Sequence, residues 1–169
     1  MTIAEVLADA LSRVQQVVHE VVTGLSPDQL AYRPDPSANS IGWLVWHLTR
    51  AQDDHVADAA GTEQVWLADG WSDRFGLPFD SRATGWSQTA DEVGAFRVAD
   101  GELLTGYHDA VYARTLDFVG SLTESDLDRV VDTRWDPPVT LGVRLVSVID
   151  DDAQHAGQAA YLRGLITPG

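Results

Sequence analysis

The chain has no cysteine and no lysine, and acidic residues far outnumber basic ones. Without cysteine there can be no disulfide framework, no zinc–thiolate site and no cysteine nucleophile. All 11 basic residues are arginines, against 26 Asp and Glu, which gives a formal net charge of −15. Because binding to phosphate needs clustered positive charge, the sequence predicts no nucleic-acid partner. For the same reason it predicts no contact with an anionic membrane surface.

Long apolar runs are also missing. No segment approaches the roughly 18 uninterrupted apolar residues of a membrane-spanning helix. The first residues enter directly into an amphipathic pattern, without the basic and apolar regions of a signal peptide. The sequence therefore predicts a cytoplasmic protein. Its 169 residues, 44% of them hydrophobic, are enough for one packed core, and we expect a single domain over residues 1–169.

Helical periodicity dominates the sequence. Apolar residues recur at helical spacing in four long segments: 2–24, 40–61, 99–120 and 140–166. Thr2 with Glu5 has the spacing of a capping box, and the same signature predicts short helical turns after Ser26, Thr89 and Thr123. There is no convincing strand alternation and no internal repeat. The sequence therefore predicts an all-α fold, a four-helix bundle.

The connections in this bundle are uneven, and the longest lies between the second and third helices. Residues 62–88 are punctuated by glycine and proline and are rich in aromatic residues: Trp66, Trp71, Phe75, Phe79 and Trp86. Aromatic residues at this density predict an ordered excursion and not a linker. Two alternatives remain open for it. The segment forms a lid or one wall of a pocket, or it covers one end of the bundle.

Asp151 and His155 are the strongest candidates for chemistry. They are four residues apart in the last predicted helix, so they are neighbours on one face, roughly 5–6 Å apart at Cβ. Asp152 falls on the apolar stripe of that helix and competes with Asp151 as the relevant carboxylate. A carboxylate that faces a core is costly unless it is paired or binds a metal. The pattern indicates either half of a metal site or a buried Asp–His hydrogen bond.

His47 could supply a third ligand. Its neighbours one turn away are Trp43, Leu44 and Ala51, so we expect it to face the bundle interior. Helical bundles build metal sites from inward-facing residues on facing helices. Two histidines and one carboxylate leave coordination positions open for water or substrate, as catalytic sites require. The alternative is that His47 packs within a cluster of core tryptophans.

The other polar candidates have weaker patterns. Asp54 lies two turns beyond His47 on the same side of the helix, where it could be a fourth ligand, an outer hydrogen-bond acceptor or a solvated charge. Gln158, one turn past His155, could hydrogen-bond a ligand. His19 and His108 flank the apolar stripes of their helices, and we interpret both as structural.

Two motifs resemble those of a known family. Residues 40–48 read Ser-Ile-Gly-Trp-Leu-Val-Trp-His-Leu, and residues 151–164 read Asp-Asp-Ala-Gln-His-Ala-Gly-Gln-Ala-Ala-Tyr-Leu-Arg-Gly. They resemble the second-helix and last-helix motifs of the DinB-like (YfiT-like) four-helix bundles, and the resemblance spans essentially the whole chain. In that family, a divalent metal, often zinc or nickel, is held by one histidine on the second helix and by two residues four apart on the last. The latter are a histidine or glutamate followed by a histidine. The resemblance implies His47, Asp151 and His155 as ligands, with Asp151 one methylene shorter than glutamate.

The same resemblance implies an activity. The family includes thiol-dependent transferases that use bacillithiol or mycothiol, and the mycothiol-dependent maleylpyruvate isomerase. It therefore implies metal-dependent transfer of a low-molecular-weight thiol to a small electrophile, in a homodimer, with Asp54 as a candidate proton acceptor. The isomerase carries a second, C-terminal domain, so we do not expect that reaction here. The alternative is a metal- or small-molecule-binding stress protein without turnover, in which Asp54 or Asp152 would complete the coordination sphere.

Overall fold

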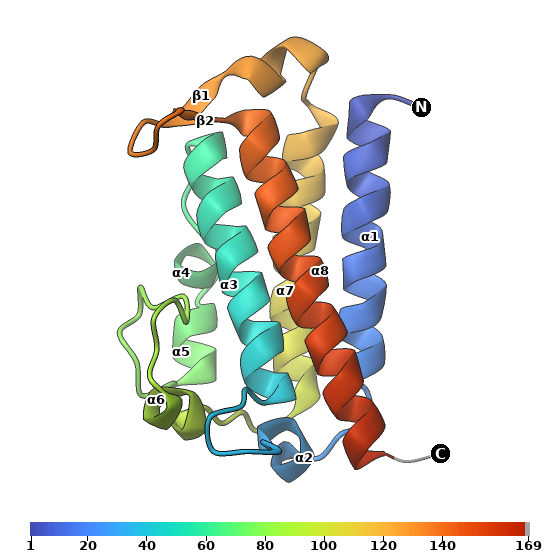
Figure 1. Ribbon diagram of the computed structural model, residues 1–169, viewed down its shortest axis with the longest axis vertical. Coiled ribbons are helices and arrows are strands. Elements are labelled where there is room, and N and C mark those ends of the chain that lie inside the picture. The colour runs from blue at the N-terminus through green and yellow to red at the C-terminus, as the bar shows by residue number, and fades with distance from the viewer. Residues whose placement is uncertain (168–169) are drawn as a thin grey trace.

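The computed structural model describes residues 1–167. Its four long helices, α1 (Ile3–Val22), α3 (Ile41–Ala60), α7 (Gly101–Gly120) and α8 (Leu141–Ile166), run side by side (Figure 1). Both α1 and α3 pack against α7 and α8. In Figure 1, α3 runs upward and α8 downward, so these two neighbours are antiparallel. The predicted all-α four-helix bundle is confirmed.

Side-chain caps determine where these helices begin. The Thr2 hydroxyl accepts a hydrogen bond from the Glu5 N–H, and the Glu5 carboxylate accepts one from the Thr2 N–H, which is the predicted capping box. The third long helix begins at Gly101, two residues later than predicted. The reason is that the Asp100 carboxylate accepts a hydrogen bond from the Leu103 N–H and so acts as the cap.

Shorter elements fill the connections. They are α2 (Pro27–Ala31), α4 (Val65–Ala68), α5 (Trp71–Phe75), α6 (Ala90–Ala95), the 3₁₀ helix η1 (Glu124–Asp128) and the strands β1 (Val130–Asp132) and β2 (Val139–Thr140). The two strands pair antiparallel, with Val130 opposite Thr140. The sequence did not predict this hairpin, because strands of three and two residues are too short to show an alternating pattern.

The aromatic segment 62–88 lies along the outside of α3 and α7 (Figure 1). Trp66 and Phe75 are buried, and their rings pack against Tyr107 of α7, with centroids 5.0 and 5.9 Å away. By contrast, Trp86 is 83% exposed. The first part of the segment therefore extends the core sideways and does not cover an end of the bundle. Exposed residues occur along the whole segment, and in its last part Gly85 is buried beside the exposed Trp86.

Because of this sideways extension, α3 is buried on nearly every side. It contacts α7, α8 and the segment 62–88, and it buries five polar residues beside its apolar ones: His47, Thr49, Arg50, Gln52 and Asp53. Among the helices of residues 1–167, none combines the length and the apolar character needed to cross a membrane.

Candidate metal centre

His47, Asp151 and His155 lie together between α3 and α8. One ligating atom from each of the three lies within 4.8 Å of the others. The Oδ1 atom of Asp151 is 3.6 Å from Nε2 of His155, and the two imidazole centroids are 4.9 Å apart. The structure thus brings together the three residues that the sequence singled out.

The ring of His47 is fixed from two sides. Trp43, one turn earlier on α3, stacks on it with a centroid distance of 4.7 Å. Its Nδ1–H donates to the carbonyl oxygen of Thr84 at 2.5 Å. A neutral imidazole that donates from Nδ1 keeps its lone pair on Nε2, the atom available to a metal. Burial lowers the pKa of His47, although the hydrogen bond to Thr84 opposes this, and the neutral, metal-binding form is favoured.

The ring of His155 is oriented in the same manner. Its Nδ1–H donates to the side-chain oxygen of Gln158 at 2.9 Å, one turn along α8. Nε2 of His155 therefore carries the lone pair and is the nitrogen closest to Asp151. The sequence suggested that Gln158 could hydrogen-bond a ligand. In the structure, its hydrogen-bond partner is His155, itself a candidate metal ligand.

Asp151 carries the signal that most favours a cation. Its Oδ2 atom is buried and has no hydrogen-bond partner within residues 1–167. Its Oδ1 atom, at 3.6 Å from His155, is too far away for a hydrogen bond. Leaving a buried carboxylate oxygen unpaired is costly. A simple Asp–His hydrogen bond is therefore not what the structure contains, and a bound cation would satisfy these oxygens.

The donor set fits a divalent transition metal. Imidazole nitrogen and carboxylate oxygen suit zinc and nickel, and tetrahedral ligands about 2.0–2.2 Å from zinc lie roughly 3.3–3.6 Å from each other. The Asp151–His155 separation of 3.6 Å already matches this value. These three residues would leave the fourth position of a bound zinc ion open, which is typical of catalytic zinc sites.

The other predicted carboxylates lie apart from this cluster. Asp54 is 42% exposed, and its Oδ1 accepts a hydrogen bond from the Gln64 side chain at 2.7 Å. Seven residues separate it from His47, which is about 10 Å along the helix axis. Asp152 is fully buried in the helix interface with neither oxygen hydrogen-bonded inside the described range, and burial raises its pKa well above the usual value. Asp152 does not belong to the group of potential ligands formed by His47, Asp151 and His155.

Two histidines are structural, as the sequence suggested. His19 is 2.8 Å from Asp109, which ties α1 to α7. His108 is buried with its Nδ1 atom 3.1 Å from the hydroxyl oxygen of Thr49. Neither belongs to the candidate metal centre.

Sequence reasoning missed the residues that hold His47 from outside its own helix. Thr84 and Gly85 lie in the irregular segment before α6. Gly85 has φ of +93°, and a Cβ atom built on it would lie 2.6 Å from Nδ1 of His47. Only glycine lets the backbone pass this close. The glycine itself was visible as a break in the pattern, but its contact with His47 depends on the tertiary fold.

Comparison with known proteins identifies the family and the fold of the chain. The sequence model of the mycothiol-S-transferase family matches residues 6–168. The chain belongs to this family. A crystal structure described as a conserved protein from Enterococcus faecalis is 32% identical, with a TM-score of 0.91 over 98% of this chain and 97% of that chain. No curated protein matches the sequence.

The family match and the structural similarity both extend over almost the whole chain. The relative from Enterococcus faecalis has the same fold over almost its full length. The family match covers α3 and α8, the two helices that carry His47, Asp151 and His155.

Proposed function

We propose that this protein is a divalent-metal-dependent transferase that moves mycothiol, or a similar low-molecular-weight thiol, onto a small electrophile. The observation that carries the proposal is the cluster itself. Two imidazoles whose Nδ1 atoms are already hydrogen-bonded lie beside one carboxylate, and that carboxylate has a buried oxygen without a partner among residues 1–167. Family membership supports a thiol as one of the two substrates.

In this proposal, His47, Asp151 and His155 hold zinc or nickel. When bound, the ion supplies a positive charge that lowers the pKa of a coordinating thiol, so that the sulfur is a ready nucleophile at neutral pH. Trp43 and the Thr84 carbonyl fix the orientation of His47. Asp54 is our candidate acceptor for the thiol proton, because it is exposed and lies on the same side of α3.

The competing function is a metal-binding protein without turnover. Such a protein would be expected to fill the coordination sphere with a fourth side chain. Within residues 1–167, the grouping of potential ligands contains His47, Asp151 and His155, and neither Asp54 nor Asp152 belongs to it. An open position favours an enzyme over a storage or sensing site.

The first test measures metal content by elemental analysis of protein purified without an affinity tag. We expect about one metal ion per chain in the wild type, and loss of that metal in His47→Ala, Asp151→Ala and His155→Ala. His19→Ala is the matched control, because it removes a histidine of α1 that pairs with Asp109 of α7 and does not belong to the cluster. Wild-type protein that stays free of metal after incubation with zinc and nickel would contradict the proposal.

The second test measures turnover by the metal-loaded protein. With mycothiol and monobromobimane, the thiol sulfur bonds to carbon, bromide leaves, and the thiol proton passes to a base. We expect Asp54→Asn to lower kcat and to retain the metal. If the loaded wild type transfers no thiol to any electrophile in a broad panel, the transferase proposal is wrong and the binding protein becomes the better account.

A further inference from the structure

A cavity of about 240 Å³ lies between the C-terminal halves of α3 and α7, next to the turn that follows α3. Ala57 and Ala60 offer only methyl groups to this space, and Gly61 then turns the chain in the left-handed conformation, with φ of +69°. The two helices are therefore not closed against each other at this point. The lining includes no residue of α8 and none of the three candidate metal ligands, so the cavity is separate from the candidate metal centre.

The interior of the cavity is apolar. Val56, Val111 and Phe118 line it beside the two alanines. The buried polar residues of the lining already have partners: the Thr115 hydroxyl donates to the Val111 carbonyl, and the Asp53 carboxylate accepts three hydrogen bonds. Because an engineered apolar cavity of roughly 150 Å³ binds benzene, this one has room for a benzene-sized group and a few further atoms.

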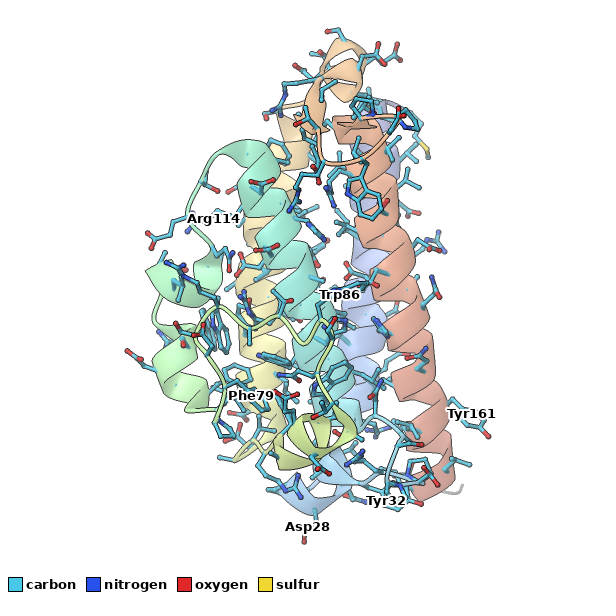
Figure 2. All side chains as sticks on the ribbon, turned by 60° about the vertical axis from the view of Figure 1, so that its left-hand side comes forward. Asp28, Tyr32, Phe79, Trp86, Arg114 and Tyr161 are labelled. Carbon is cyan, nitrogen blue, oxygen red and sulfur yellow. The ribbon has the colours of Figure 1, made fainter. Side chains whose placement is uncertain are left out.

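The rim of the cavity is negatively charged. Glu63 and Asp117 are exposed there, and neither forms an ion pair within residues 1–167. Arg114 also lines the cavity, but its guanidinium lies 3.9 Å from Asp69, which directly follows α4 (Figure 2). The buried Asp53 has a counter-charge of its own. Two uncompensated carboxylates therefore flank an apolar interior.

We propose that this cavity binds a small organic amine that carries an apolar group. The apolar group is buried between α3 and α7, where its removal from water stabilises the complex. The ammonium stays at the rim beside Glu63 and Asp117, whose charges attract a cation and repel an anion. The inference does not rest on the transferase function, because the cavity shares no residue with the metal cluster.

The first experiment compares probes that share one aromatic ring and differ in charge. Benzylamine is a cation at neutral pH, benzyl alcohol is neutral and benzoate is an anion. Each is titrated into the full chain at low ionic strength, and the amide NMR shifts of α3 and α7 are followed. A ligand of this size is expected to bind in the millimolar range.

We expect benzylamine to bind at least about fivefold more tightly than benzyl alcohol, and benzoate to bind most weakly. The advantage of benzylamine should shrink in about 0.5 M salt, because charges at an exposed rim are screened. If benzylamine does not bind, or if the three probes bind equally, the proposal is wrong.

The second experiment fills the cavity. Ala60→Leu adds a larger side chain to the lining at a position that is only partly buried, so the helix can accommodate it. Ala113→Leu is the matched control, because Ala113 is exposed on α7 and absent from the lining. We expect Ala60→Leu to abolish saturable binding of benzylamine and benzyl alcohol, and Ala113→Leu to keep the wild-type affinities. Unchanged binding to Ala60→Leu would place the probe elsewhere and overturn the proposal.

The third experiment removes the charges of the rim. The double variant Glu63→Gln, Asp117→Asn should weaken benzylamine by about fivefold and leave benzyl alcohol unchanged. Asp58→Asn is its control, since Asp58 is an exposed carboxylate of α3 outside the lining. An equal loss in Asp58→Asn would mean that the net charge of the protein, and not the rim, attracts the amine.

Discussion

Gly85 crosses directly over the imidazole of His47, so closely that no side chain fits between them. A Cβ atom at this position would lie 2.6 Å from Nδ1 of His47 and 3.0 Å from Cζ2 of Trp43. The preceding residue, Thr84, supplies the carbonyl oxygen that accepts the hydrogen bond from the same nitrogen. A segment without regular structure therefore determines which nitrogen of His47 faces the candidate metal centre.

Gly85→Ala should consequently weaken metal binding. The added methyl group has to push the segment away from α3, and the hydrogen bond between His47 and Thr84 is then lost. Removal of such an outer partner of a metal ligand typically lowers the affinity about 10–100-fold. The measurement is metal affinity by competition with a chelator.

Gly70→Ala is the control for this prediction. Gly70 lies in the same segment and also has a positive φ, of +72°, but a Cβ atom there meets nothing within 4 Å. It therefore shares the backbone strain of Gly85→Ala without the clash. Equal metal affinities for the two variants would show that contact with His47 does not matter.

Asp151→Asn should remove the negative charge of the cluster while keeping the shape of the side chain. We expect metal affinity to fall at least about tenfold, because an anionic ligand adds Coulombic attraction that a neutral amide lacks. Asp150→Asn is the matched control, since Asp150 is the preceding residue and hydrogen-bonds Gln154 outside the cluster. Isothermal titration with zinc measures both. Similar losses in both variants would mean that net charge alone, and not ligation, explains the effect.

Helix boundaries followed closely from the sequence because caps are local. Ser40 begins α3 by accepting a hydrogen bond from the Trp43 N–H, and Thr140 begins α8 by accepting one from the Val143 N–H. The four-residue spacing of Asp151 and His155 placed them on one helix face for the same reason. Local sequence patterns therefore sufficed to predict the helices of the bundle and the pairing of Asp151 with His155 on one helix face.

Contacts made by irregular segments could not be predicted in this way. That the Thr84 carbonyl reaches His47 depends on the path of residues 62–88, which has no repeating pattern. The Arg50–Asp53 ion pair was also missed, although both residues face a core. Their burial results from the aromatic segment that covers α3, and helical periodicity contains no information about such a covering layer.

Asp53 should be a main stabilising residue of that covering layer. Its carboxylate accepts hydrogen bonds from the N–H groups of Val65 and Trp66 and from the hydroxyl of Tyr107, and it lies 3.6 Å from Arg50. Asp53→Ala leaves the buried Arg50 without its counter-charge, which typically costs about 3–5 kcal/mol of unfolding free energy. Urea denaturation of metal-free protein measures this.

Asp54→Ala provides the comparison for Asp53→Ala. Asp54 is the next residue on α3 but is 42% exposed, so we expect a change of less than about 1 kcal/mol. If both substitutions cost the same, the buried network does not anchor the segment.

His108 should make stability depend on pH. It is completely buried in α7, where it contacts the Thr49 hydroxyl, and that hydroxyl donates to the Val45 carbonyl. The Thr49 oxygen can therefore accept from Nδ1–H of His108, whereas the buried Nε2 has no acceptor for a second proton within residues 1–167. Burial lowers the pKa of His108 from 6.5 to about 4, with Asp109 opposing the effect and His19 adding to it.

The sign of the pH effect follows from which state binds the proton. The unfolded chain binds a proton at His108 near pH 6.5, whereas the folded protein resists it until about pH 4. The unfolding free energy should therefore fall as the pH drops through this window, by up to about 3 kcal/mol from this group. Urea denaturation at several pH values should show a smaller fall in His108→Gln than in the wild type. Parallel curves for wild type and His108→Gln would mean that the buried ring is not what resists acid.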